Sequence, residues 1–177
     1  ALVAGAGDNP ARLSANGNAA FLSGQSAGPA HVTGYLFSPD HWPKGETGVA
    51  GAIVMSGVYR AFGDRVGPGM FAYFGDDEAV RRANCPLTRV PANRTPMLVG
   101  VMQYDPPDIA VHSFQAARGL TRSSDRAPEF HWFPGHNHAS TVYGIVSGQD
   151  EVGETILRFV ADKRGGAWPT RTGSRSG

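Results

Sequence analysis

Short apolar segments of strand length recur along the chain, separated by polar and glycine-rich stretches. The four segments are NAAFLS at 18–23, VAGAIVMS at 49–56, PMLVGVM at 96–102 and EFHWF at 129–133. The middle two are continuously apolar, which is typical of strands that are covered on both faces of a sheet. We therefore predict a strand at each of the four segments.

Apolar residues with helical spacing follow the first, third and fourth strands. The expected helices cover 27–37, 106–119 and 147–163, and a further short helix is expected at 75–83. In the helix at 106–119, Ala110, Phe114 and Ala117 share an apolar face, and Gly119 is placed to end the helix.

The last helix has an apolar stripe with acidic residues early and basic residues late, the polarity that the helix dipole favours. The stripe consists of Val152, Ile156, Phe159 and Val160. Alternation of strands and helices is typical of a parallel sheet. We predict an α/β fold, a mostly parallel sheet with helices on both faces, in one domain over 1–162 followed by a flexible tail over 163–177.

Composition narrows the possible partners. Net charge is +1 over 177 residues, with no large charged block, so neither nucleic-acid binding nor a polybasic membrane anchor is supported. No apolar run approaches the roughly 18 residues that span a bilayer.

The single cysteine, Cys85, excludes an internal disulfide and is interpreted as a small packed residue. One cysteine fits either cytoplasm or periplasm, so the compartment stays undecided.

Parallel sheets place their sites at the carboxyl ends of the strands, so the residues after each apolar segment are informative. GQSAG at 24–28 follows the first strand. If a helix starts here, Ser26 takes a strained backbone conformation, and Gly24 and Gly28 let strand and helix approach closely. The Ala27 N–H then lies at a helix start, where it can face a developing oxyanion. An ordinary Gly/Ser turn has the same letters.

Asp105 follows the third strand, in MQYDPPD. A carboxylate at this point can accept a hydrogen bond from a histidine Nδ1–H and hold the ring in one tautomer. Taken alone, an Asp–Pro turn or a helix cap is the simpler explanation. Asp108 is the competing carboxylate, and we expect it in the first turn of the helix, where it would stabilise the helix dipole.

The fourth strand leads into PGHNHAS, in which His136 and His138 flank Asn137. A general base belongs on such a loop. A His-x-His metal pair is the alternative, but a metal site needs a third or fourth ligand and no other His or Cys cluster is nearby, so we predict neither a metal nor a cofactor. The other histidines are interpreted as packing or surface residues: His31, His41, His112 and His131.

Serine, aspartate and histidine thus follow three strand ends in the chain order of α/β-hydrolases. The sequence resembles that superfamily over nearly all of 18–160, specifically its carboxylesterase, hormone-sensitive-lipase-like and kynurenine-formamidase-like branch. The matching segments are FLSGQSAGPAHVTGYL, AIVMSGVY, TPMLVGVMQYDPP, FPGHNHAS and a final ILRFV helix. The resemblance implies Ser26 as nucleophile, Asp105 as acid, and His138, in preference to His136, as base. It also implies Ala27 as one oxyanion donor.

The sequence departs from that family in one respect. Members carry further strands and an HGG-type loop with the remaining oxyanion donors before the serine turn, whereas 1–17 looks like the helix that leads into the serine's strand. We therefore expect the C-terminal part of a longer serine hydrolase that cleaves small-molecule carboxylic esters through an acyl-enzyme. Two alternatives stay open: amide hydrolysis by an arylformamidase, and a catalytically inactive fragment or binding member of the fold.

Aromatic residues gather in the irregular segment between the second and third strands. They are Phe71, Tyr73 and Phe74, with the apolar Met70 beside them. These side chains either form part of an apolar wall for the acyl group or pack as ordinary core residues.

Overall fold

The computed structural model describes residues 20–42, 45–63, 66–90, 95–124, 126–145, 147 and 150–164. Within these ranges, four parallel strands form one sheet in the order β1-β2-β3-β4. The strands are β1 (Phe21–Gln25), β2 (Gly51–Met55), β3 (Met97–Tyr104) and β4 (Glu129–Asn137). The α-helices are α2 (Gly28–Leu36), α3 (Pro68–Phe74), α4 (Glu78–Asn84), α5 (Pro107–Ser124), α6 (Ser140–Tyr143) and α7 (Glu151–Lys163), and the 3-10 helices are η2 (Pro39–His41) and η4 (Pro86–Thr88).

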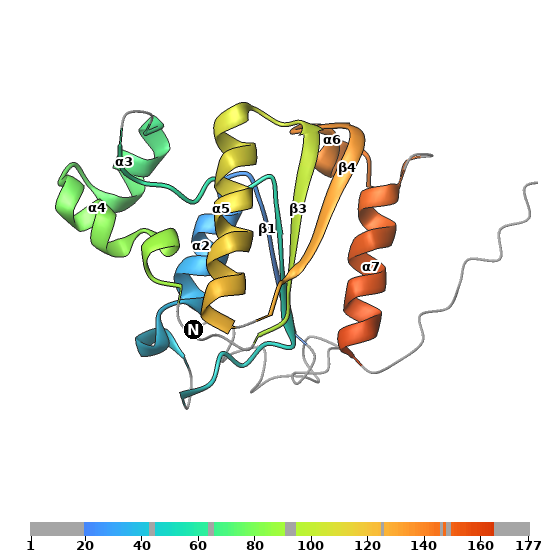
Figure 1. Cartoon of the computed structure of the whole chain (residues 1–177), viewed down its shortest axis with the longest axis horizontal. Helices are drawn as coiled ribbons and strands as arrows, with labels where there is room; N and C mark the ends of the chain where they lie inside the picture. The colour runs from blue at the N-terminus through green and yellow to red at the C-terminus, as the bar shows by residue number, and fades with distance from the viewer. Residues whose placement is uncertain are drawn as a thin grey trace, which may run out of the picture.

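Helices cover both faces of the sheet, as Figure 1 shows: α2 and α5 lie on one side of the strands and α7 lies on the other. The two apolar clusters follow this division. Val32 and Leu36 of α2 pack with Ala116 and Leu120 of α5 against the first face. On the second face, Phe159 of α7 packs with side chains of β2, β3 and β4. The predicted α/β class, with a parallel sheet between helices, is confirmed.

The alternation of side chains along β2 explains why its sequence is apolar throughout. Ala52 and Val54 enter the cluster with α2 and α5, whereas Ile53 and Met55 enter the cluster with α7. Every residue of this strand is buried, because successive side chains of a strand point to opposite faces and both faces are covered. The continuous apolar pattern therefore marks the centre of the sheet.

Helix α5 differs from its prediction in length and in face. It continues past Gly119 to Ser124, so Gly119 does not end it. Phe114 is 50% exposed, and the buried positions are instead His112, Ser113, Ala116 and Leu120. Burial lowers the pKa of His112, and the nearby charge of Arg60 lowers it further against an opposing effect of Asp108.

The strands also differ from the predicted bounds: β2 is shorter than 49–56, and β3 extends past residue 102 to Tyr104. β1 ends at Gln25, directly before Ser26, whereas the predicted strand ended two residues earlier, at residue 23. β4 continues through Pro134 and Gly135 to Asn137, so His136 lies in a strand where the sequence indicated a loop. The predicted helix at 75–83 is α4, which Asp77 caps through its side chain. Residues 1–17 and 165–177 lie outside the described residues, whereas Lys163, where the predicted tail begins, is the last residue of α7.

None of the helices within the described ranges is long and apolar enough to cross a membrane.

The apolar stripe predicted for the last helix is confirmed in α7, because Val152 and Phe159 are fully buried while Ile156 and Val160 pack against the same cluster.

The packing of α7 leads to a stability prediction. Removing the Phe159 ring leaves a cavity where α7 meets the sheet, so Phe159→Ala should lower the free energy of unfolding by about 3–5 kcal/mol. Leu157→Ala on the same helix is the control, because Leu157 is 37% exposed, and it should cost much less. Urea unfolding of the full-length protein measures both, and equal losses would contradict the assigned face of α7.

Candidate active site

Ser26, Asp105 and His138 come together at the carboxyl ends of the strands. The distance between Ser26 Oγ and His138 Nε2 is 2.9 Å, and His138 Nδ1 lies 3.2 Å from Asp105 Oδ1. These residues follow β1, β3 and β4 and are separated by up to 112 positions along the chain. Because the strands are parallel, their carboxyl ends share one edge of the sheet, and this brings the three side chains within hydrogen-bonding distance.

Ser26 occupies a sharp turn between β1 and α2 with a φ of 60°. A non-glycine residue in this left-handed region is uncommon and costs of order 1–3 kcal/mol. Two backbone hydrogen bonds hold the turn against the segment around β2: the Ser26 N–H donates to Met55 O, and the Val58 N–H donates to Ser26 O. The backbone conformation that the sequence predicted for Ser26 is thus present.

The two glycines of GQSAG differ in what they permit. A Cβ atom on Gly24 would lie 2.6 Å from the carbonyl carbon of Gly28 and 2.8 Å from the nitrogen of Pro29. A Cβ on Gly28 would have nothing within 4 Å. The close approach of strand and helix therefore requires glycine at position 24, and the same reason given for Gly28 from the sequence is wrong.

Ala27 precedes the first residue of α2 and adopts a helical backbone conformation. The first N–H groups of a helix have no partner within the helix and carry the positive end of its dipole. Ala27 follows the serine directly, so its N–H lies at the start of the helix, as the sequence predicted.

The carboxylate of Asp105 is held by three partners, and the exposed fraction of its side chain is 0%. Its Oδ2 accepts hydrogen bonds from the Ser56 hydroxyl and from the Met102 N–H, both at 2.9 Å. Its other oxygen, Oδ1, contacts Nδ1 of His138. Asp108 lies in the first turn of α5, as expected for the competing carboxylate.

Ser56 is a polar site residue that the sequence analysis did not single out. It follows β2, is fully buried, and has a φ of 47°. Its N–H donates to Gly100 O, and its hydroxyl lies 3.3 Å from that of Thr141 besides donating to Asp105. The signal was available, because Ser56 is the polar residue that ends the second apolar segment, VAGAIVMS, and parallel sheets place their sites at the carboxyl ends of strands.

The two histidines of PGHNHAS have different surroundings. His136 is buried within β4, and its Nδ1 lies 3.2 Å from the Ser140 hydroxyl. His138 is part-exposed and contacts both Ser26 and Asp105. Asn137 shapes the loop, because its Oδ1 accepts hydrogen bonds from the N–H groups of Ala139 and Ser140. Only His138 therefore contacts the other two candidate residues.

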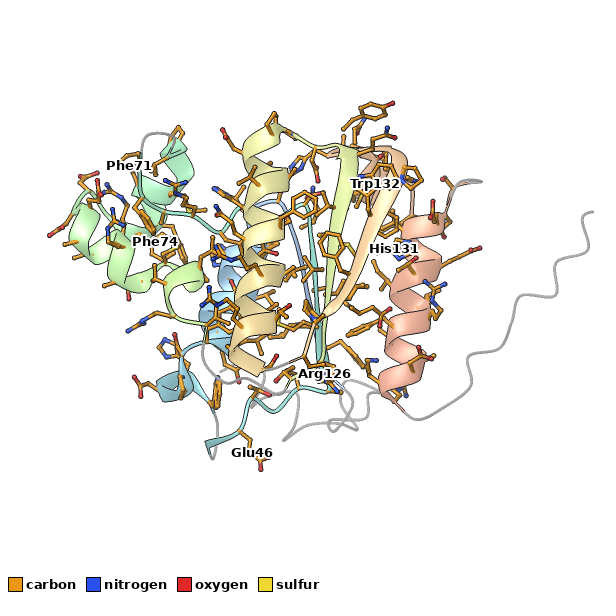
Figure 2. All side chains as sticks on the ribbon, in the orientation of Figure 1. Glu46, Phe71, Phe74, Arg126, His131 and Trp132 are labelled. Carbon is orange, nitrogen blue, oxygen red and sulfur yellow. The ribbon has the colours of Figure 1, made fainter. Side chains whose placement is uncertain are left out.

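The aromatic residues of α3 pack against neighbouring helices. Met70 is buried with Ala30 and Cys85, and Phe74 packs against this cluster. Phe71 lies under the Arg81 guanidinium, 4.4 Å from ring centroid to Cζ. Figure 2 shows Phe71 and Phe74 at the α3–α4 side of the molecule, away from β4, which carries Trp132. Met70 and Phe74 thus match the core alternative, and Cys85 is a packed residue as predicted.

The contacts of the remaining histidines within the described ranges are with residues other than Ser26 and Asp105. His131 lies between β4 and α7 (Figure 2), where its Nε2 is 3.7 Å from Glu151 Oε1. His31 on α2 contacts the Tyr73 ring, with 4.4 Å between the centroids. His41 is exposed in η2. In the described ranges, no group of three His, Cys, Asp or Glu side chains could hold a metal ion.

A cavity of about 730 Å³ lies at the opposite end of the sheet, at the amino-terminal ends of β3 and β4. Met97, Glu129 and Lys163 are among the residues that line it, and none of the three candidate site residues does. The cavity is therefore separate from the candidate active site.

Solved esterase structures share this arrangement of strands and helices. The hyperthermophilic esterase from the archaeon Pyrobaculum calidifontis superposes with a TM-score of 0.68 at 16% identity over 93% of this chain. Esterase 2 of Thermogutta terrifontis superposes with a TM-score of 0.68 at 17% sequence identity over 96% of this chain. The carboxylesterase Cest-2923 from Lactobacillus plantarum superposes with a TM-score of 0.69 at 15% sequence identity over 94% of this chain. The chain has an α/β-hydrolase fold. It spans 56%, 64% and 66% of these three proteins, respectively.

No protein-family model matches the sequence, and no curated protein does. Further structures of the Thermogutta esterase are bound to propionate or butyrate. Others are phosphoramylated by tabun or phosphonylated by sarin.

The glycines of the serine turn lead to a paired prediction. Gly24→Ala forces a Cβ atom into the backbone of α2, so it should lower the free energy of unfolding by about 1–3 kcal/mol. Gly28→Ala places its methyl group in open space and should change stability by no more than about 0.5 kcal/mol. Urea unfolding of both variants tests this, and equal stability of the two would contradict the close approach at Gly24.

Ser56 gives a second prediction for this site. Ser56→Ala removes a hydrogen bond to a buried carboxylate and should cost about 1.5–3 kcal/mol of unfolding free energy. Ser56→Gly removes the same bond but adopts a positive φ without strain, so it should be more stable than the alanine variant. Chemical denaturation separates the two contributions, and a Ser56→Ala protein as stable as the wild type would contradict the role of the hydroxyl.

Proposed function

We propose that this chain carries the catalytic residues of a serine hydrolase that cleaves carboxylic esters through an acyl-enzyme. The observation that carries the proposal is the continuous hydrogen-bonding chain from Ser26 Oγ through the His138 imidazole to Asp105. The left-handed backbone of Ser26 and the esterase structures with the same fold support it.

The roles follow from the chemistry of each contact. With Asp105 accepting at His138 Nδ1, the neutral ring keeps its proton on Nδ1 and offers Nε2 as the base. Nε2 takes the hydroxyl proton as Ser26 Oγ bonds to the ester carbonyl carbon. The C–O bond to the alcohol then breaks, and His138 returns the proton to the leaving oxygen. Water repeats the sequence on the acyl-enzyme, which releases the acid and restores Ser26.

The oxyanion of each tetrahedral intermediate needs hydrogen-bond donors. We assign the Ala27 N–H as one donor, because it follows Ser26 directly at the start of α2. The remaining donors would come from outside the described residues. Since the loss of a single donor raises the barrier by about 2.7–4 kcal/mol, activity is best measured on the full-length protein.

Short acyl groups are the substrates we propose. The Thermogutta esterase, which shares the fold, binds propionate and butyrate. The same esterase reacts with sarin, and covalent phosphonylation requires an activated nucleophile. A fluorophosphonate probe is therefore a suitable reagent for testing whether Ser26 is activated.

The proposal predicts hydrolysis of 4-nitrophenyl acetate or butyrate that depends on Ser26. Ser26→Ala removes the nucleophile and should lower kcat roughly 10⁴-fold or more. Ser23→Ala is the matched control, since Ser23 lies in the same strand with an exposed side chain, and it should retain activity. Steady-state kinetics and mass spectrometry of the fluorophosphonate adduct provide the measurements. Equal turnover by the wild type and Ser26→Ala would end the proposal.

The same experiment separates the alternatives. An arylformamidase would use the same three residues, so rates on N-formylkynurenine and on a short ester identify the preferred bond. A binding member of the fold would be folded yet unlabelled by the fluorophosphonate. We favour ester cleavage because the three solved structures compared above are esterases.

A further inference from the structure

Gln25 connects the turn that carries Ser26 to the loop that carries His138. It is the last residue of β1, and its side chain is half-buried. Its Nε2 donates a hydrogen bond to the backbone carbonyl of His138 at 3.1 Å and lies 3.4 Å from His138 Nε2. The first contact has ordinary hydrogen-bond length, whereas the second is long, so the amide mainly holds the backbone of the loop.

Other hydrogen bonds near His138 have different effects. Those between Asn137 and the N–H groups of Ala139 and Ser140 lie within the loop, so they fix its shape but not its position. The Gly135 N–H donates to Gln103 Oε1, which ties the end of β4 to β3. In the described part of the chain, the hydrogen bonds that join the β1 turn to the His138 loop come from Gln25 and Ser26.

The Ser26 contact cannot hold the loop throughout the proposed reaction. When Ser26 is acylated, its oxygen has lost its proton and no longer donates to His138. His138 must nevertheless stay in place, because it activates water for deacylation. The Gln25 contact involves a side-chain amide and a backbone carbonyl, and neither changes during the reaction.

We propose that Gln25 is a positioning residue that holds His138 in place while the serine is acylated. The inference rests on the proposed function and adds a residue to it. The Gln25 amide lies 3.4 Å from His138 Nε2, but its hydrogen bond of ordinary length is to the His138 carbonyl, so we assign its effect to the backbone of His138. Its removal should therefore slow deacylation more than acylation, because only in the acyl-enzyme is the Ser26 hydroxyl unavailable as a second tether.

Gln25→Met tests the inference, since methionine has a similar length and no N–H donor. With 4-nitrophenyl butyrate, the full-length variant should lose roughly ten- to hundredfold in kcat, as expected when a catalytic group is misplaced by about 1 Å. KM should not rise, and a pre-steady-state burst of nitrophenol should appear because the acyl-enzyme accumulates. Loss of folding alone would lower the burst amplitude and would not create a burst.

Two other glutamines serve as controls. Gln115→Met changes an exposed residue of α5 and should leave kcat unchanged. Gln103→Met removes the bond to Gly135 and should create no burst. Unchanged kcat and no burst in Gln25→Met, with Ser26-dependent activity in the wild type, would overturn the role of Gln25 and leave the proposed function standing.

Amide hydrogen exchange gives a readout that does not depend on activity. In Gln25→Met, the N–H groups of 138–143 should exchange at least about tenfold faster than in the wild type, because opening of the loop becomes easier. Ser26→Ala keeps the Gln25 contact and should show a smaller change. Unchanged exchange in Gln25→Met would overturn the tether even if the protein proved to have no esterase activity, whereas absent activity alone would overturn only the proposed function.

Discussion

The buried carboxylate of Asp105 is the constraint on which the candidate site depends. Burial of a charge is expensive unless hydrogen bonds replace the lost water. Ser56 and the Met102 N–H supply two such bonds to Oδ2, and this leaves Oδ1 directed at His138. These two bonds therefore also orient the carboxylate and connect the ends of β2 and β3, and the contact of Oδ1 with His138 adds the end of β4.

Backbone strain marks the same edge of the sheet. Within the described residues, the non-glycine positions with positive φ are Ser26 and Ser56, which directly follow β1 and β2. Strained residues persist only where their surroundings determine them. Here the surroundings are backbone hydrogen bonds to neighbouring strands: Ser26 with Met55, and Ser56 with Gly100. The parallel sheet thus supplies the bonds that hold each serine at a strand end.

Strand ends could be identified from the sequence because continuous apolar runs are a strong local signal. This made Ser26 and Asp105 candidates, although simple turns explained each of them, and the family resemblance implied their roles and the choice of His138 over His136. The face of α5 was misassigned because its buried side includes His112 and Ser113, whereas Phe114 stays exposed and stacks on Phe130. Pattern alone cannot reveal this, because the packing depends on a partner strand further along the chain. Gln25 was missed for the same reason.

Two degrees of freedom of His138 must be controlled if the proposed reaction is to complete a cycle. Asp105 controls the rotation of the ring, since it binds Nδ1 from a fixed, buried position. It does not by itself control the position of the backbone, because a part-exposed loop can shift while one ring contact is kept. Gln25 acts on the backbone through the His138 carbonyl. Because Gln25 precedes Ser26 in the chain, any displacement of the serine turn carries the tether with it, and in the proposed mechanism this keeps the base and the nucleophile aligned.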